Sequence, residues 1–169
     1  AISPFFFKKD PEEILPLSSL ILEKIKKTGK GRPNTGKDTG KVIALLIEGE
    51  NVSPKYIKPI LDGGVVSAPP AYKRIYGDWT NNDMSNWKRV LLENNLTPIQ
   101  QFSYTQGKNA TDSAMIIDAM DILYAENVDG FCLVSSDSDF TKLASRLRES
   151  RMFVIGMGET KTPTAFKAA

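Results

Sequence analysis

From residue 42 onward, the chain alternates between two patterns of apolar and polar positions. Short continuous apolar runs such as VIALLI are typical of strands covered on both faces of a sheet. Longer segments with apolar residues every three or four positions, such as TDSAMIIDAMDILYAEN, are typical of amphipathic helices. Strands are expected at 42–47, 71–77, 97–104, 131–135 and 152–157. Helices are expected at 54–62, 84–95, 111–127 and 138–150.

This alternation of strand and helix predicts the fold class. Strands that alternate with helices form α/β folds, in which a parallel sheet carries helices on both faces and the crossovers are right-handed. The chain is therefore expected to form a mainly parallel sheet of five strands. Pro59 is expected to break or kink the first helix, because proline lacks the N–H group that a helix interior needs.

Acidic residues follow the expected strands at three places. Glu48 ends the first apolar run and is followed by Glu50 and Asn51, Asp137 and Asp139 follow the run FCLVS, and Asp112 follows the third strand after a loop. In open parallel sheets, ligands bind beyond the carboxyl ends of the strands, near the switch in strand order. We therefore expect these acids to converge at one site.

Helix geometry places Asp112 on the inner face of its helix. Successive residues turn by about 100°, so position 112 shares a face with the apolar positions 115, 116, 119 and 123. A carboxylate that points inward needs a partner, and a divalent cation shared with Glu48 and Asp137 would be one. Asp112, Asp137 and Asp139 also lie near helix N-termini, so the alternative is that each caps backbone N–H groups.

The composition narrows the chemistry further. The 169 residues include no histidine and a single cysteine, Cys132, which excludes catalytic triads built on histidine, histidine metal sites and thiolate zinc sites. Carboxylates are then the expected carriers of any chemistry, and they favour Mg²⁺ or Mn²⁺. A lone cysteine favours a reducing, cytoplasmic setting. No apolar run is long enough to span a bilayer.

The first 40 residues differ in character from the rest. Residues 1–41 hold nine Lys and Arg against five Asp and Glu, whereas the whole chain has a net charge of +2. The segment PEEILPLSSLILEKIKK predicts a helix, and KIKKTGKGRPNTGKDTGK has the composition of a linker. Residues 1–40 are therefore assigned to a helical extension and a basic linker. The linker is either a solvated tether or a weak attractor of nucleic acid.

Several long segments resemble one protein family. LLIEGENVSPKYIKPIL, RIYGDW, QQFSYTQGKNATDSAMIIDAMDILY, VDGFCLVSSDSDFTKLASRLRES and VIGMGETKTP are similar to segments of the NYN domain family, a branch of the PIN-like nucleases. The chain resembles most the bacterial-type members that often carry a LOTUS (OST-HTH) domain downstream. The resemblance covers 41–169. It implies a PIN-like α/β/α sandwich of three layers, a Mg²⁺- or Mn²⁺-dependent nuclease centre and RNA as the substrate.

The resemblance also implies roles for individual residues. The acidic pocket of the family falls on Glu48, Asp112, Asp137 and Asp139 as metal ligands and catalytic residues, with Asn51 orienting a ligand or the phosphate. Contacts with nucleic acid are expected from Lys108, Asn109, Ser135, Lys142 and Lys161. Each lysine, taken alone, also fits an ordinary solvated surface position. PIN-like domains often pair, so a homodimer is a further expectation.

Two positions depart from the family pattern. Glu48 stands where an Asp is expected, and its extra methylene moves the carboxylate of a site that tolerates displacement poorly. The alternative to a ribonuclease is therefore a catalytically weak RNA-binding or adaptor module on the same fold. Arg151 stands where a Gly commonly follows the Arg-Glu-Ser sequence at a helix end, which is a structural departure only.

Overall fold

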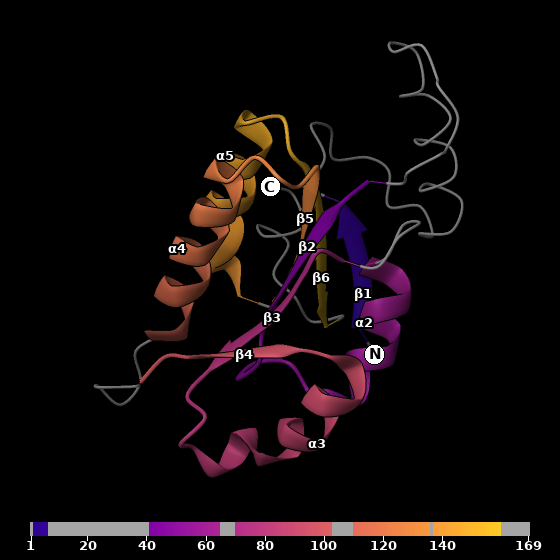
Figure 1. Ribbon diagram of the computed structural model, residues 1–169, viewed down its shortest axis with the longest axis vertical. Coiled ribbons are helices and arrows are strands. Elements are labelled where there is room, and N and C mark those ends of the chain that lie inside the picture. Colours follow the sequence, from indigo (N-terminus) through magenta and orange to yellow (C-terminus); the bar gives the residue numbers. More distant parts are fainter. Residues whose placement is uncertain (1, 7–40, 65–69, 103–109, 136, 160–169) are drawn as a thin grey trace.

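A single sheet forms the centre of the molecule. The structure is a computed structural model that describes residues 2–6, 41–64, 70–102, 110–135 and 137–159. The sheet has six strands in the order β1-β6-β5-β2-β3-β4 (Figure 1). The strands are β1 Ile2–Phe6, β2 Ile43–Glu48, β3 Tyr72–Gly77, β4 Thr97–Gln100, β5 Gly130–Val134 and β6 Phe153–Glu159.

The five strands from β2 to β6 run parallel to one another, which confirms the predicted sheet. The sixth strand, β1, pairs antiparallel with β6 at the edge of the sheet, with Pro4 opposite Met157. Proline is tolerated in an edge strand, where its missing N–H group need not join a ladder. Residues 2–6, assigned to the N-terminal extension from the sequence, therefore belong to the sheet. The helix and linker expected further along that extension lie outside the described residues.

Helices cover both faces of the sheet and make three layers, as predicted. Figure 1 shows α2 and α3 on one face and α4 and α5 on the other. The α-helices are α2 Ile57–Gly64, α3 Ser85–Asn94, α4 Ala110–Tyr124 and α5 Thr141–Glu149. Short 3-10 turns precede three of them, η1 Pro54–Tyr56, η2 Asn82–Met84 and η3 Ser138–Phe140. Pro59 lies at the third position of α2, where its missing N–H breaks no intrahelical bond.

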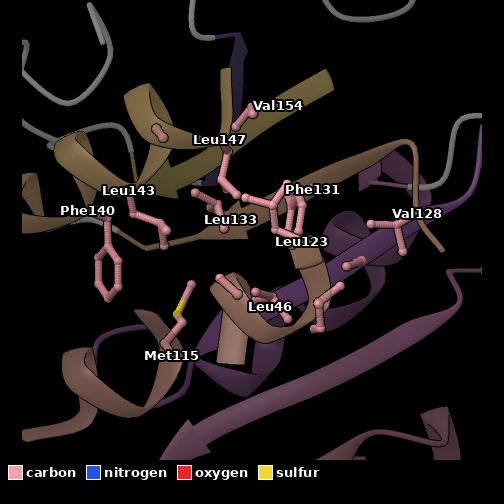
Figure 2. Close-up of a cluster of buried hydrophobic side chains, with 14 of the residues drawn as sticks. Leu46, Met115, Leu123, Val128, Phe131, Leu133, Phe140, Leu143, Leu147 and Val154 are labelled. Carbon is pink, nitrogen blue, oxygen red and sulfur yellow. The ribbon is translucent and has the colours of Figure 1, made fainter. Parts of the chain in front are cut away.

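The core has two halves, one on each face of the sheet. Every residue of β2 is buried, and successive side chains point to opposite faces. Ile43, Leu45 and Ile47 pack in the half that includes residues of α2 and α3. Ala44 and Leu46 pack in the other half, with residues of α4 and α5 (Figure 2). Among the described residues, no helix is both long and apolar enough to cross a membrane.

The strand order places a switch point between β2 and β5. From β2 the chain moves to β3 and β4 on one side, then returns through α4 to β5 on the other side. The segments that follow β2 and β5 therefore leave in opposite directions, and the end of the sheet between such strands is where open parallel sheets bind ligands. Glu48 and Ser135 lie at these two ends.

Candidate active site

Glu48 is a buried carboxylate at the carboxyl end of β2. Its side chain is 1% exposed, and by alternation it points to the same face as Leu46, toward α4 and α5. Ser135 follows β5 directly and is fully buried. Since Ile47 pairs with Val134 in the parallel ladder, Glu48 and Ser135 are the next neighbours beyond that pair. The ladder thus brings together two polar residues separated by 87 positions in the sequence.

Two side chains donate hydrogen bonds to the Glu48 carboxylate. The Asn51 amide Nδ2 donates to Oε1, and the Ser135 hydroxyl donates to Oε2. Removing a carboxylate from water is costly unless hydrogen bonds compensate, and bonds to an ionised acceptor are the strong ones. Asn51 and Ser135 therefore fix the orientation of the carboxylate at the switch point. The sequence predicted that Asn51 orients a metal ligand or the phosphate and that Ser135 contacts nucleic acid, and the contact of either residue with phosphate or nucleic acid stays a prediction.

Ser135 also connects Glu48 to Asp137. The Asp137 backbone N–H donates to the Ser135 Oγ at 3.0 Å, and the Asp137 Oδ1 accepts from the Asp139 N–H at 2.9 Å. The second bond is a helix-capping contact at the start of η3, which was the alternative role that the sequence left open for Asp137. Asp137 is half-buried and Asp139 is exposed. A carboxylate oxygen has two lone pairs, so capping and cation binding are compatible at Asp137.

The other predicted site residues are less fully described. Asp112 lies in the first turn of α4, which begins at Ala110, but its side chain is outside the described part of the structure. Lys108, Asn109 and Lys161 also lie outside the described residues. Lys142 is exposed at the second position of α5. The structure thus joins Glu48 to Asn51, Ser135 and Asp137, and the convergence of Asp112 on them stays a prediction.

A second polar cluster at the same end of the sheet was missed by sequence reasoning. Asp78 follows β3 directly and is 9% exposed. Its Oδ1 accepts from the Thr80 N–H and from the Gln100 Nε2, both at 3.0 Å, and its own N–H donates to the Glu50 Oε1 at 3.0 Å. Asp78 therefore ties together the ends of β2, β3 and β4. The sequence signal was available, because Asp78 follows a predicted strand just as Glu48 does.

A third cluster holds α4 against the sheet. Asp118 of α4 accepts hydrogen bonds from the Arg74 guanidinium and the Tyr76 hydroxyl, both on β3. Burial first, and then the bond to Asp118, raise the pKa of the Tyr76 hydroxyl well above its usual value. Burial lowers the pKa of Arg74, but its contact with Asp118 outweighs burial and leaves that pKa raised. These bonds fix the helix whose first turn carries Asp112.

The donor set at the switch point suits a hard divalent cation. Glu48, Asp137 and Asp139 offer carboxylate oxygens, the ligands that Mg²⁺ and Mn²⁺ prefer. Among the side chains that the structure describes, no group of three or more His, Cys, Asp or Glu residues is arranged to hold a metal ion. Asp112 is not among those side chains. The carboxylates match the predicted metal in kind, and their assembly around one ion with Asp112 stays a prediction.

Comparisons with known proteins agree with this fold. A crystal structure of a protein of unknown function from Vibrio parahaemolyticus is similar, with a TM-score of 0.54 at 18% identity over 71% of this chain and 82% of that one. No curated protein matches the chain. The sequence profile of the NYN domain matches residues 42–169, which span β2 to β6 and every residue of the candidate site. The chain therefore belongs to the NYN domain family.

Proposed function

We propose that this protein is a metal-dependent ribonuclease that hydrolyses phosphodiester bonds at the carboxyl ends of β2 and β5. One observation carries the proposal. The buried Glu48 carboxylate is held by Asn51 and Ser135 at the switch point of the sheet, and Ser135 connects it to Asp137. Burial of a carboxylate costs free energy that apolar packing avoids, and a role in binding a cation would account for its presence at the switch point.

Family membership supports the same reading. NYN domains are nuclease-like in general, and nucleases of this kind generally use divalent metal ions. The chain has no histidine to act as a general base, which favours its carboxylates as the reactive centre. RNA is proposed as the substrate because RNA is the substrate that the family resemblance implies.

The chain's own residues would divide the work as follows. Glu48, Asp112, Asp137 and Asp139 would hold Mg²⁺ or Mn²⁺, which when bound lowers the pKa of a water molecule and screens charge on the phosphate. Asn51 and Ser135 keep the Glu48 carboxylate in one orientation, as residues that support metal ligands commonly do.

The basic and amide residues near the strand ends would bind the substrate. The proposed contacts to the RNA backbone are Lys108, Asn109, Lys142 and Lys161. Lysine suits this role because its ammonium group is a point charge that attracts phosphate without demanding a fixed geometry.

One observation favours a second candidate, an RNA-binding module with weak or absent catalysis. Glu48 replaces the expected Asp, and each of its carboxylate oxygens already accepts a hydrogen bond from a protein side chain. A carboxylate fixed in this way serves catalysis only if its position matches the metal. On the second candidate, Glu48 holds the strand ends together and the protein binds RNA without cutting it.

Cleavage of single-stranded RNA in the presence of Mn²⁺ tests the proposal. The wild type should cleave, and Asp137→Asn should reduce the rate on the order of 100-fold or more, since even residues that only support a ligand cost 10–100-fold. Asp121→Asn is the matched control, because Asp121 is exposed on α4. Equal cleavage by the wild type and Asp137→Asn would overturn the proposed centre. RNA binding without cleavage by the wild type would favour the second candidate.

A further inference from the structure

A groove of about 540 Å³ lies between the start of η1 and the first turns of α3, and none of its lining residues belongs to the acidic centre. The polar residues that line it are Ser53, Lys55, Ser85, Asn86 and Arg89. The two charged side chains are both cations, and no carboxylate lines the groove. The apolar residues that line it are Pro54 and Val90. This composition favours an anion over a metal ion or an apolar ligand.

The walls of the groove are joined by buried contacts. Trp87 of α3 is 1% exposed, and its indole Nε1 donates to the Gly49 carbonyl at 3.0 Å and to the Val52 carbonyl at 3.2 Å. These bonds attach the side of α3 to the loop that leaves β2. The two cations therefore project from elements held at a fixed separation, so binding an anion between them needs no rearrangement of the backbone.

The polar groups of the groove all can donate hydrogen bonds. Arg89 offers a planar guanidinium that binds phosphate oxygens in pairs, and Lys55 offers an ammonium group. The Lys55 Nζ lies 4.9 Å from the centre of the Tyr56 ring, a contact that restrains the long side chain. The hydroxyls of Ser53 and Ser85 and the amide of Asn86 add neutral donors. A phosphate group matches this set in charge and in the number of acceptors.

The groove is close in the chain to the acidic centre. The loop that leaves Glu48 passes Asn51, whose side chain bonds to Glu48, and reaches the groove at Ser53. An RNA strand bound at the carboxyl end of the sheet would meet this loop. We propose that the groove between η1 and α3 binds a backbone phosphate of the same single-stranded RNA that the Glu48 centre would cleave. This inference rests on the proposed function and assigns a second anchoring point to its substrate.

Two double variants with equal loss of charge test the groove. Lys55→Ala/Arg89→Ala removes both cations of the groove, and Lys58→Ala/Lys88→Ala removes two exposed lysines from α2 and α3 that do not line it. All four side chains are exposed, so both proteins should fold. Thermal unfolding of each protein checks this before binding is measured.

Fluorescence anisotropy with a labelled single-stranded RNA of about 12 nucleotides, within the range of single-strand site sizes, gives the affinity. The measurement is made in EDTA so that cleavage cannot interfere. The groove variant should bind about tenfold more weakly, and the slope of log K against log salt should fall by about 0.7, the value for one lost phosphate contact on a single strand. The control variant should change affinity less than about twofold, since exposed charges off the binding path are screened.

The outcomes separate the groove from the catalytic proposal. If both variants lose RNA affinity equally, or if neither loses any, the groove is not a phosphate-binding site, whether or not the wild type cleaves RNA in Mn²⁺. If only the groove variant loses affinity, phosphate binding in the groove is supported. If the wild type then fails to cleave, the ribonuclease proposal falls while the phosphate site stands. If the wild type cleaves RNA and the groove variant binds RNA like the wild type, the ribonuclease proposal is supported and the phosphate site in the groove is ruled out.

Discussion

Tyr76 donates a hydrogen bond to Asp118, which lies 42 residues further along the chain. Tyr76 is fully buried in the central sheet, and Asp118 also pairs with the Arg74 guanidinium. The three side chains join β3 to the middle of α4, two turns beyond Asp112. The first turn of α4 thus owes its place at the strand ends to a polar contact as well as to the apolar packing of Met115 and Ala119.

Removal of the Tyr76 hydroxyl should lower the free energy of unfolding. Tyr76→Phe deletes a buried hydrogen bond to a charged acceptor, and such bonds contribute about 1.5–3 kcal/mol. Tyr72→Phe on the same strand is the matched control, because the Tyr72 hydroxyl accepts its bond from Asn127 at an exposed site. The control should change the free energy by less than about 0.5 kcal/mol. Urea unfolding at pH 7 measures both, through a shifted midpoint at constant slope.

Asp118→Asn extends that measurement to a double-mutant cycle. If Tyr76 and Asp118 act as one unit, the loss in the double variant should be smaller than the sum of the two single losses by about 0.5–3 kcal/mol. Strictly additive losses would mean that the two side chains are stabilised by separate neighbours.

Ser135→Ala should weaken Mn²⁺ binding without unfolding the protein. The substitution removes the hydroxyl that donates to Glu48 and accepts from the Asp137 N–H. Loss of a residue that supports metal ligands typically costs 10–100-fold in affinity, so the Kd for Mn²⁺ should rise by about that factor. Calorimetric titration with Mn²⁺ provides the measurement. Ser135→Thr keeps the hydroxyl and should restore most of the affinity, whereas an unchanged Kd in Ser135→Ala would remove Ser135 from the metal centre.

The fold was predictable from the sequence where local pattern decides it. The run at 42–47 predicted a strand covered on both faces, and the structure buries every residue of β2. The edge strand β1 was not predicted. Its five residues form a strand because they pair with β6, which is far away in the sequence, so no local pattern predicts this strand. The strand expected at 97–104 ends at Gln100, while 103–109 lies outside the described residues.

The candidate site, like the fold, was predictable from the sequence only in part. The sequence placed Glu48 and Asp137 at one edge of the sheet, because parallel strands bring their carboxyl ends together, and Ser135 connects Glu48 to the backbone N–H of Asp137. Asp118 lies outside the set of apolar positions 115, 116, 119 and 123 on its helix, and its partners are polar groups on β3. Arg74 and Tyr76 stand two residues apart and so point to one face, which was the available signal. Which helix residue would meet them depends on how α4 packs across β3, which the sequence does not specify.

Cys132 should make the stability of the protein fall at alkaline pH. The thiol is fully buried in β5, and burial raises its pKa to about 12. Above the unfolded value near pH 9, the unfolded chain releases its proton first, so the free energy of unfolding falls by about 1.4 kcal/mol per pH unit until pH 12. Below pH 9 the thiol is neutral in both states and contributes no pH dependence.

Cys132→Ala isolates this contribution. The difference in unfolding free energy between the wild type and the variant should be constant from pH 7 to pH 9 and then shrink by about 1.4 kcal/mol per unit. The tyrosines and lysines also ionise in this pH range, but both proteins contain all of them, so their contributions cancel in the difference. A difference that stays constant up to about pH 11 would show that the thiol ionises as readily when folded. Urea midpoints across this pH range give the data.

Arg151→Gly should stabilise the protein. Arg151 follows the end of α5 with a φ of 64°, and its N–H donates to the Arg148 carbonyl at 2.9 Å while the Met152 N–H donates to the Leu147 carbonyl at 3.1 Å. This pair of bonds is the Schellman arrangement, in which the left-handed position favours Gly. An L-residue in this conformation costs about 1–2 kcal/mol, which the glycine variant avoids. Glycine loses more backbone entropy on folding, which offsets part of that gain, so the variant should be more stable by about 1 kcal/mol.

Ser150→Gly is the control for that gain. Ser150 lies one residue earlier with a φ of −81°, where glycine relieves no strain, and its hydroxyl accepts a hydrogen bond from Arg146. The control should therefore lose about 1–2 kcal/mol, from backbone entropy and the lost bond together. Thermal and urea unfolding of the wild type, Arg151→Gly and Ser150→Gly measure these changes in unfolding free energy, which should have opposite signs in the two variants. A loss of stability in Arg151→Gly would show that the Arg151 side chain contributes more than its backbone strain costs, and the departure from the family pattern would then stabilise this chain.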